Sequence, residues 1–475
     1  MTSRRKVKIV ATVGPASDEA KVLQQLVNAG VNVFRMNFSH GTHAEHLRRY
    51  ELIRNVEEQS GRPLGVLVDL QGPKLRLGEL ATGKLAIAPG DVLRLGLPEP
   101  DSSSDLIPLP HPEILEVLTA GSTLLIDDGR VRLRVISGDG KSITAEVVAG
   151  QELSSRKGIN VPDVELPIPS MTEKDRADLA FVMEHIEADW VALSFVQRPQ
   201  DVIELRELLG DKMAIMAKIE KPSALTHIDA ILELVDGIMV ARGDLGVELP
   251  PEQVPGVQKR LVQRCRECGI PVVVATHMMD SMVAAPVPTR AEASDVANAV
   301  YEGADAVMLS AETAAGNYPV AAVAMMSRII SEVEKDPHYL TLLESAAPQH
   351  EATTADAICA ALREVSRVIG SSVTVTYTSS GFTSLRAARE RPHSVLLSLT
   401  AAPAIARRLS IVWGTNCVLV DSYNEDTAFN HLVVQAREIS VELGLASPGD
   451  FLTVSAGLPL GSPGRTNVLR IVEVR

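Results

Sequence analysis

Short apolar runs rich in β-branched residues recur along the first two thirds of the chain, and amphipathic segments separate them. The middles of the runs are almost continuously hydrophobic, which is typical of strands covered on both faces in a parallel sheet. In one separating segment, residues 18–30, apolar positions recur at helical spacing. The runs lie at residues 6–14, 31–37, 64–72, 188–195, 213–220, 236–244, 271–276 and 304–312. Eight strand–helix units predict a closed (β/α)₈ TIM barrel.

The stretch after the third run has a different pattern. Short alternating runs are separated there by Gly-Asp-Gly and Asp-Asp-Gly turns, which is typical of a small all-β domain. We expect residues 74–168 to form an inserted β lid domain, placed at the C-terminal face of the barrel. The catalytic barrel would then comprise residues 1–73 and 169–343.

The last part of the chain, beyond a helix predicted through Lys335, changes pattern again. Residues 338–354 show no strand pattern, and we interpret them as a linker. Helices and strands then alternate, which predicts an open α/β sheet in a C-terminal regulatory domain of residues 344–475. Three domains suit a chain of 475 residues.

Composition narrows the possible partners and compartment. The formal net charge is −14 and only 3% of the residues are aromatic, which argues against nucleic acid as a partner. The first apolar run is too short for a signal sequence or a membrane span, so we expect a cytoplasmic protein with no membrane partner. Four cysteines are too few for a disulfide framework. Cys265 and Cys268 form a C-x-x-C pair, but we interpret them as helix residues because no second pair completes a zinc site.

Charged and hydroxyl side chains follow six of the eight runs where each run ends. They are Arg35, Asn37, Ser39, Asp69, Lys218, Glu220, Arg242, Asp244, Thr276, Ser310 and Glu312. Because the C-terminal ends of barrel strands meet at one rim, we expect these side chains to share a pocket. The alternative is that each residue simply returns the chain to solvent, which would require the same coincidence at six strands.

The types of these residues indicate a chemistry. Glu220 and Asp244 would offer hard oxygen ligands to Mg²⁺ with room for water and substrate. Arg35 and Lys218 would add fixed positive charge, and this combination suits phosphoryl transfer from a phosphorylated anion. The chain has neither a Walker loop nor a Rossmann glycine pattern, so a nucleotide would have to bind between barrel and lid.

Five stretches of the sequence resemble pyruvate kinases. They are KIVATVGPAS, FRMNFSHG, MAKIEKPSAL, IMVARGDLGVELP and PTRAEASDVANAVYEGADAVMLSAETAAGNYP. The resemblance covers nearly the whole chain, and the last stretch is too long to match by chance. It implies transfer of a phosphoryl group from phosphoenolpyruvate to ADP and protonation of the enolate to pyruvate, the last step of glycolysis.

The resemblance also implies roles for single residues. Arg35 would hold the transferring phosphoryl group, and Lys218 would stabilise its charge in the transition state. Glu220 and Asp244 would bind Mg²⁺ (or Mn²⁺). Thr276 would touch the substrate near the path of proton delivery.

Two further groups of contacts follow from the same resemblance. The amides of Gly243 and Asp244, at the start of a short helix, would receive the substrate carboxylate. ADP would arrive with a second Mg²⁺. The residues that would contact this nucleotide are Asn37, His40, Arg76 and Lys157.

The stretch LVDLQGPKLRLG departs from the pattern of many relatives. In those relatives, residues matching Asn37, Ser39, Asp69 and the carbonyl of Leu70 hold a K⁺, and a glutamate lies nearby. Lys74 takes the glutamate position here. A fixed ammonium supplies positive charge and repels K⁺, so we predict activity without K⁺, as in the K⁺-independent branch. The alternative is that Lys74 points to solvent and K⁺ still binds.

Two other features concern pH and regulation. His277 replaces the usual glutamine and would either alter the pH profile or act as a structural hydrogen-bonding group. The stretch YTSSGFTSL resembles the family's loop for a phosphorylated effector, although helix capping is an alternative. We expect a sugar monophosphate or AMP as activator, because the loop GLPLGSPGRTN differs from that of fructose-bisphosphate binders. The effector residues would be Thr378, Ser379, Ser380, Gly381 and Thr383.

Two other functions stay open at this point. A Mg²⁺-dependent aldolase or lyase could stabilise a pyruvate enolate on the same rim without Arg76 or Lys157. A catalytically silent regulatory paralogue is the second, although the intact set of rim residues argues against it. The resemblance to pyruvate kinases implies a homotetramer.

Overall fold

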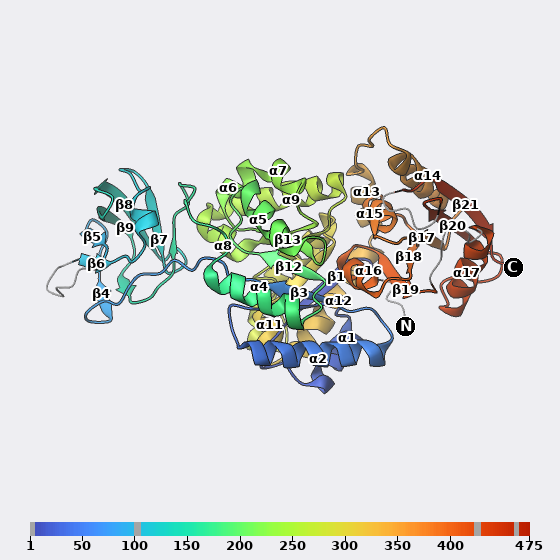
Figure 1. The fold of residues 1–475 in the computed structure, drawn as a ribbon, viewed down its shortest axis with the longest axis horizontal. Coiled ribbons are helices and arrows are strands. Elements are labelled where there is room, and N and C mark those ends of the chain that lie inside the picture. Colours follow the sequence, from blue (N-terminus) through green and yellow to red (C-terminus); the bar gives the residue numbers. More distant parts are fainter. Residues whose placement is uncertain (1–4, 99–105, 422–428, 460–464) are drawn as a thin grey trace.

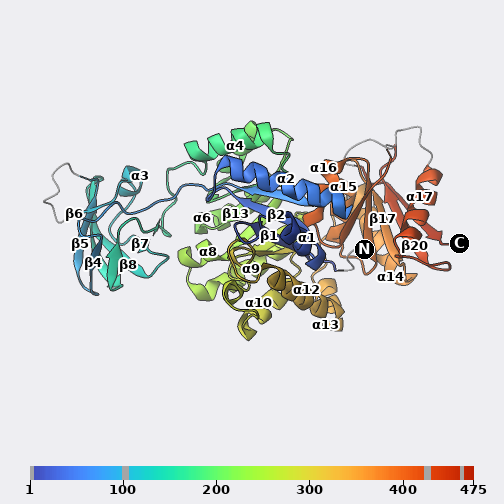
Figure 2. The ribbon, with the colours of Figure 1, turned by 90° about the horizontal axis from the view of Figure 1, so that it is seen from below.

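The computed structural model describes residues 5–98, 106–421, 429–459 and 465–475. Three bodies lie in a row along the longest axis: the lid domain at one end, the barrel in the middle and the C-terminal unit at the other end (Figure 1). A perpendicular view shows the same order (Figure 2). The lid and the C-terminal unit therefore cover different ends of the barrel.

Eight parallel strands form a closed barrel and neighbour one another in chain order. They are β1 (Lys8–Val13), β2 (Val33–Asn37), β3 (Gly65–Asp69), β12 (Trp190–Leu193), β13 (Ala214–Ile219), β14 (Gly237–Ala241), β15 (Val272–Ala275) and β16 (Ala306–Leu309). β16 closes the barrel on β1, with Lys8 paired with Ala306. All residues of β1, β3 and β12 are buried, as expected for strands covered on both faces. The predicted fold class is confirmed.

Helices surround the barrel. They are α1 (Ala20–Ala29), α2 (His43–Ser60), α4 (Glu173–His185), α5 (Pro199–Leu209), α6 (Pro222–Thr226), α7 (Ile228–Leu232), α9 (Val254–Cys268), α10 (Arg290–Tyr301) and α12 (Pro319–Lys335). Capping boxes begin α2, α4 and α10, because Thr42, Thr172 and Thr289 each exchange hydrogen bonds with the acidic residue three positions later. Short helical segments follow strands at the rim or connect them: α8 (Arg242–Glu248), η1 (Pro251–Gln253), η2 (Asp280–Val283) and α11 (Ala311–Ala314).

The chain between β3 and α4 is mainly strands, as the alternating pattern predicts. These are β4 (Lys84–Ala86), β5 (Val92–Gly96), β6 (Leu106–Pro108), β7 (Thr123–Ile126), β8 (Val131–Gly138), β9 (Ser142–Ala149), β10 (Glu152–Ser154) and β11 (Ile159–Asn160), with helix α3 (Pro112–Leu115). They form a six-stranded and a two-stranded sheet over a hydrophobic core separate from that of the barrel. Two segments, which we call the stalks, connect this lid to the barrel: one follows β3 and the other precedes α4. The domain boundaries at 73/74, 168/169 and 343/344 stay predictions.

The C-terminal unit contains a five-stranded sheet in the order β19-β18-β17-β20-β21, in which β21 alone is antiparallel. The strands are β17 (Val373–Tyr377), β18 (Val395–Thr400), β19 (Thr415–Leu419), β20 (Phe451–Ala456) and β21 (Val468–Glu473). Its helical segments are α14 (Thr354–Val368), α15 (Phe382–Arg389), α16 (Pro403–Arg408), η3 (Leu409–Ile411) and α17 (Phe429–Glu442). The predicted open α/β sheet is confirmed.

The prediction of a linker over residues 338–354 is wrong for its first half. Helix α13 (Pro337–Ser345) occupies it, and Asp336 caps the helix by accepting the N–H of His338. Tyr339 is buried there, and its hydroxyl accepts a hydrogen bond from Trp413 Nε1 at 3.0 Å. Tertiary burial of the aromatic ring, which local patterning does not reveal, holds this segment as a helix.

The C-terminal unit packs against the N-terminal end of the barrel. Lys8, at the start of β1, donates to the carbonyl of Thr415, and Trp190, at the start of β12, donates to the carbonyl of Arg408. Residues of η3 join the hydrophobic cluster that fills the barrel interior. The C-terminal ends of the strands consequently point away from this unit and towards the lid.

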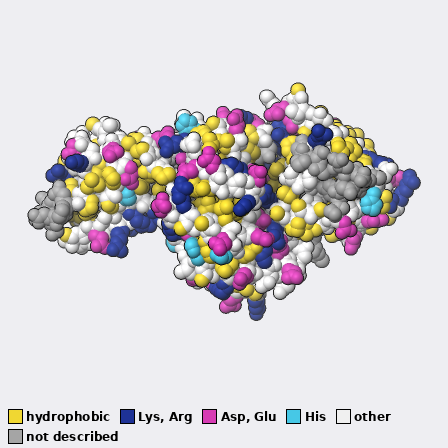
Figure 3. Space-filling model, in the orientation of Figure 1, with side chains coloured by type: hydrophobic (Ala, Val, Ile, Leu, Met, Phe, Trp, Pro, Cys, Tyr) yellow, Lys and Arg dark blue, Asp and Glu magenta, His cyan; other side chains and the backbone are white. Residues whose placement is uncertain are grey.

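Acidic and basic side chains are interspersed over the face shown in Figure 3, so neither charge dominates it. Within the described ranges, no helix has both the length and the apolar character needed to cross a membrane. All four cysteines are free, and Cys265 and Cys268 lie on α9 as the sequence predicts.

Candidate active site

Asp69 lies at the end of β3 between two cations from other strands. Its Oδ2 is 2.6 Å from Nε of Arg35 on β2, and its Oδ1 is 3.2 Å from Nζ of Lys218 on β13. The carboxylate is buried, which alone would raise its pKa, but Lys218 and Arg35 together hold the pKa below its usual range. Asp69 is therefore an ionised partner shared by both cations.

Lys218 is the centre of the cluster. Besides Asp69, its Nζ contacts Glu220 Oε1 at 2.9 Å and donates to Ser194 Oγ at 2.7 Å. Burial opposes the charged form, yet Asp69 and Glu220 raise the pKa of Lys218 above its usual value. The ammonium stays protonated at any physiological pH and acts as a fixed charge.

Glu220 and Asp244 supply the two carboxylates expected to hold a metal. Glu220 is buried, and its Oε2 accepts the backbone N–H of Phe195 at 2.8 Å. Its Oε1 makes no aligned hydrogen bond, although Lys218 Nζ lies close. Burial raises the pKa of Glu220 to about 7; Lys218 opposes this shift, and the nearby negative charge of Asp244 adds to it. A buried oxygen without an aligned donor, next to a second carboxylate, fits a divalent cation.

No group of three or more His, Cys, Asp or Glu side chains that could hold a metal ion occurs in the part of the chain that the structure describes. A metal ion at Glu220 and Asp244 would therefore take its other ligands from substrate and water. Mg²⁺ is commonly bound in that way, through one or two carboxylates and substrate phosphates.

The end of β15 lies beside the start of α8. Thr276 has a φ of 67° and His277 a φ of 54°, values that are uncommon for residues other than glycine. Arg242 holds this loop by donating to the carbonyl of Thr276 at 2.8 Å, and it pairs with Asp295 at 2.7 Å. The Gly243 N–H, expected to receive the substrate carboxylate, donates to Thr276 Oγ1 at 2.6 Å. The threonine hydroxyl thus stands at the place of the expected ligand.

The predicted rim residue Glu312 and the neighbouring His277 do not join the charged cluster. Glu312 is buried and accepts the backbone N–H groups of Ser310 at 2.7 Å and Met279 at 3.2 Å. His277 is exposed, and a Cβ placed on Gly243 would lie 3.7 Å from its Cε1. Glu312 therefore organises backbone, whereas His277 lies beside Gly243.

Asn37 and His40, the first two expected nucleotide contacts, lie in the loop after β2. Asn37 Oδ1 accepts the N–H of Ser39 at 3.1 Å, which shapes the turn. His40 is exposed, and partial burial and the positive charges of Lys74 and Arg35 lower its pKa. His40 is therefore within electrostatic range of Lys74 on the lid stalk and of Arg35 in the charged cluster.

The other two expected nucleotide contacts lie on the lid stalks. Arg76 pairs with Gly158 through a backbone bridge, and its Nη1 donates to the carbonyl of Arg156 at 2.8 Å. Lys157 Nζ is 2.9 Å from Asp127 Oδ1. Arg76 faces the rim, while Lys157 is paired within the lid.

A cavity of about 200 Å³ separates the stalks from the rim. Its lining includes Lys74, Arg76, Phe195 and Asp244. The other three expected nucleotide contacts, Asn37, His40 and Lys157, do not line it. The Lys74 side chain is exposed at this cavity, and partial burial together with the positive charges of Arg76 and Lys174 lowers its pKa. The structure thus brings Lys74 and Arg76 together with Asp244.

Three of the four groups expected by resemblance to hold K⁺ already have protein partners. The carbonyl of Leu70 accepts a hydrogen bond from Ser194 Oγ at 2.7 Å. Asp69 is paired with Arg35 and Lys218, and Asn37 with the backbone of Ser39. Each of these acceptors is at least partly satisfied by the protein itself.

The predicted effector loop joins β17 to α15. Thr378 and Thr383 are buried: Thr378 Oγ1 accepts the N–H of Gly381 at 2.8 Å, and Thr383 Oγ1 is 2.9 Å from Thr466 Oγ1. Turn formation accounts for Thr378 and a contact with Thr466 for Thr383, whereas Ser379 and Ser380 are exposed. Residues 460–464 of the second loop lie outside the described residues.

Sequence reasoning missed two hydroxyl groups of the cluster. Ser194, just after β12, bridges Lys218 and the Leu70 carbonyl, and Thr12 on β1 accepts from Arg35 Nη1 at 3.0 Å. Both belong to the two strands for which no rim residue was predicted. Their position at a strand end was the available signal, but a serine or threonine there is also an ordinary turn residue.

Comparison with known proteins agrees with this geometry. The family model "Pyruvate kinase, barrel domain" matches residues 4–323, and "Pyruvate kinase, alpha/beta domain" matches residues 356–472. A pyruvate kinase of Agrobacterium vitis is 50% identical over 474 residues, covering 99% of this chain and 97% of the relative. One from Methylorubrum extorquens is 47% identical over 477 residues, covering 100% and 98%.

A solved structure is similar over the same length. The crystal structure of a pyruvate kinase from Cryptosporidium parvum has a TM-score of 0.92 and 31% sequence identity, and the match covers 99% of this chain and 97% of that one. Both domain models, full-length relatives and the fold agree: the chain belongs to the pyruvate kinase family of enzymes.

Proposed function

We propose that this enzyme transfers the phosphoryl group of phosphoenolpyruvate to ADP in a Mg²⁺-dependent reaction that gives pyruvate and ATP. The observation that carries the proposal is the position of Lys218, whose Nζ lies 2.9 Å from Glu220 and 3.2 Å from Asp69. A permanent cation next to a buried carboxylate with one oxygen that lacks an aligned donor is suited to a doubly charged phosphoryl group accompanied by a metal ion.

The two rim cations bind and orient the phosphoryl group. Arg35 is held by Asp69 through Nε and by Thr12 through Nη1, so its remaining N–H groups are free to face the ligand. Lys218 compensates charge in the transition state and does not act as a base, because its neighbours keep it protonated. Glu220 and Asp244 would hold Mg²⁺ or Mn²⁺, which supplies neutralisation of phosphoryl charge and polarisation of the enolate oxygen.

The substrate carboxylate binds at the amides of Gly243 and Asp244 in this proposal. The hydroxyl of Thr276 must then leave the Gly243 N–H or donate to the carboxylate itself. Its present donation to the carbonyl of Ala275, at 2.6 Å, gives it an alternative partner. The path by which the enolate is protonated would run near this hydroxyl.

ADP, with its own Mg²⁺, binds between rim and lid and contacts Asn37, His40, Arg76 and Lys157. Only Arg76 lines the cavity there. We therefore infer that the lid closes onto the rim when ADP binds, which brings Lys157 and the loop of His40 to the phosphates and excludes water.

Lys74 replaces K⁺ in the proposed reaction. Lys74 lines the cavity with Asp244, and three of the four groups that would bind K⁺ are engaged by protein groups. An added monovalent cation would meet repulsion from three nearby positive side chains, those of Lys74, Arg35 and Lys218.

Regulation is proposed at the loop of residues 378–383. The exposed hydroxyls of Ser379 and Ser380, ahead of α15, suit the phosphate of a sugar monophosphate or AMP. The active form is proposed to be a homotetramer in the cytoplasm, as the family resemblance implies.

Formation of ATP from phosphoenolpyruvate and ADP tests the proposal, with pyruvate followed through lactate dehydrogenase. We expect turnover with Mg²⁺ or Mn²⁺ and none with excess EDTA. Cleavage of an enolate-derived substrate without ATP formation would favour the aldolase alternative, and binding without any turnover would favour a silent paralogue.

A further inference from the structure

Lys221 and Glu248 form a buried ion pair that the proposed mechanism does not use. Lys221 Nζ is 2.6 Å from Glu248 Oε1, and the exposed fractions of the two side chains are 7% and 0%. They come from different elements, since Lys221 follows β13 and Glu248 ends α8. Both residues of the pair line the same cavity as Asp244.

The pair connects the two segments that carry the proposed metal ligands. Lys221 directly follows Glu220, and Glu248 lies one helical turn after Asp244 on α8. Any shift of α8 relative to the end of β13 would change two distances together, the one between Lys221 and Glu248 and the one between Glu220 and Asp244. The distance between the Glu220 and Asp244 carboxylates is therefore coupled to the ion pair.

The same pair also holds the lid. Asn160, on the lid strand β11, donates from Nδ2 to Glu248 Oε1 at 2.8 Å, and Lys221 Nζ lies 3.3 Å from the carbonyl of Val161. Residues 158–168, which we call the return stalk, thus contact both members of the pair. One buried carboxylate oxygen joins the lid, β13 and α8.

Stability alone does not account for this arrangement. Replacement of a buried ion pair by apolar residues of similar size is often neutral or stabilising, since both charges lose their hydration. Glu248 Oε2 is buried without a hydrogen-bond partner among the described residues, which adds to the cost of keeping a carboxylate here. What the pair provides is directional contacts to three elements at once.

We propose that Lys221 and Glu248 are positioning residues that set the spacing of the Glu220 and Asp244 carboxylates and fix the return stalk of the lid to them. This inference rests on the proposed role of those carboxylates in binding a divalent cation. It predicts that loss of the pair weakens metal binding and use of ADP, beyond any loss of stability.

A double variant tests the first half of the proposal. Lys221→Met with Glu248→Leu removes both charges and keeps the volume, so the fold should survive. Mn²⁺ binding to the full chain is measured by electron paramagnetic resonance without substrate. We expect the dissociation constant for Mn²⁺ to rise about tenfold, as is typical when groups that orient metal ligands are lost. A folded double variant whose dissociation constant stays within about twofold of wild type overturns the proposal.

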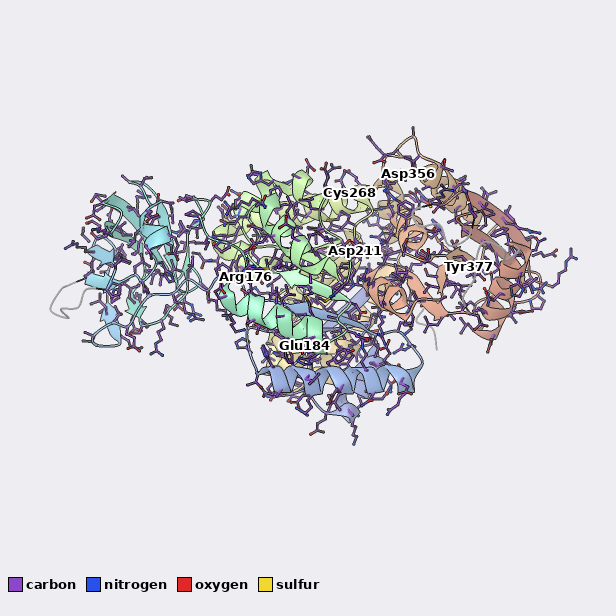
Figure 4. The ribbon with its side chains drawn as sticks, viewed as in Figure 1. Arg176, Glu184, Asp211, Cys268, Asp356 and Tyr377 are labelled. Atoms are coloured by element: carbon purple, nitrogen blue, oxygen red, sulfur yellow. The ribbon has the colours of Figure 1, made fainter. Side chains whose placement is uncertain are left out.

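Two matched variants separate position from stability. Gln197→Leu removes the other anchor of the return stalk, the paired hydrogen bonds between Gln197 and the backbone of Leu166 at 3.0 and 3.1 Å, without touching either ligand segment. Arg389→Met with Asp356→Leu removes a comparable buried pair in the C-terminal unit, where Asp356 lies at the end of the molecule away from the lid (Figure 4). Both should bind Mn²⁺ like wild type. An equal weakening in Gln197→Leu would overturn the assignment to the pair.

Asn160→Ala tests the second half, the attachment of the return stalk to the pair, independently of whether the double variant folds. It removes only the lid's side-chain contact and leaves the ion pair in place. We expect an unchanged dissociation constant for Mn²⁺ and a KM for ADP raised about fivefold or more. An unchanged KM for ADP overturns the coupling to the lid. Absence of ATP formation by the wild type would refute the proposed function instead, while the comparison of Mn²⁺ binding would still stand.

Discussion

Asp69 on β3 and Arg35 on β2 lie side by side on the barrel rim, with 2.6 Å between Oδ2 and Nε. The second oxygen of the same carboxylate faces Lys218, so one buried anion orients two cations from strands that are not neighbours of each other. Both carboxylate oxygens of Asp69 are thus engaged by protein cations. In the proposed reaction, its contribution would therefore be the placement of Arg35 and Lys218.

Asp69→Asn should lower kcat/KM by about 100-fold or more, because two cations would then lie close together without their shared anion. The amide keeps the volume of the carboxyl group, so the fold should be retained. The measurement is the coupled lactate dehydrogenase assay, with circular dichroism to check folding. Asp211→Asn, on the exposed loop after α5 (Figure 4), is the control and should behave like wild type. Activity within about threefold of wild type would contradict the assigned role of Asp69.

Lys218→Met should lower kcat by about 1,000-fold or more while Mn²⁺ binding changes little. The substitution removes the fixed charge that is proposed to face the phosphoryl group but leaves Glu220 and Asp244 in place. Initial rates and Mn²⁺ titration by electron paramagnetic resonance are the two measurements. Lys212→Met, an exposed lysine just before β13, is the matched control. If both properties were lost together, collapse of the metal site rather than loss of the charge would explain the effect.

Lys74 should make the enzyme independent of K⁺. Initial rates in tetramethylammonium or Na⁺ buffer are expected to change less than twofold when K⁺ is added, since an ammonium already occupies the cavity beside Asp244. Lys74→Glu reverses this charge and should introduce K⁺ stimulation of about tenfold or more. A strong response of the wild-type enzyme to K⁺ would mean that Lys74 points to solvent during turnover.

The fold was largely predictable because its strongest signal is local. Each barrel strand is a nearly continuous apolar run, and the polar residue that ends it marks the rim, which located Arg35, Asp69, Lys218 and Glu220. α13 was missed because burial of Tyr339 against Trp413, far along the chain, stabilises it. Local patterning contains no trace of that contact.

The connections within the site were not predictable for a related reason. The contact between Lys221 and Glu248 spans 27 positions, and that between Asn160 and Glu248 spans 88. Such contacts depend on the rotation of α8 and on the path of the lid back to the barrel. Position at a strand end indicates which residues meet at the rim but not which atoms they share.

His46 gives the protein an acid-sensitive contact at the loop of His40. The ring is buried and stacked on Phe38 with centroids 4.0 Å apart, and its Nε2 donates to the carbonyl of His40 at 2.9 Å. Burial lowers the pKa of His46 to about 4, because a proton on Nδ1 would have no acceptor. The folded form therefore binds fewer protons than the unfolded form between pH 6.5 and 4, and stability falls as pH is lowered through this window.

The size of this effect can be isolated by comparing variants. A shift of this extent corresponds to about 3 kcal/mol of unfolding free energy lost between pH 6.5 and 4. His46→Phe keeps the ring contact with Phe38 but cannot be protonated, so the fall in its urea midpoint over that pH range should be smaller than in wild type. His185→Gln, which changes an exposed histidine, should follow the wild-type profile. Parallel profiles for His46→Phe and wild type would show that His46 is protonated in the folded protein without penalty.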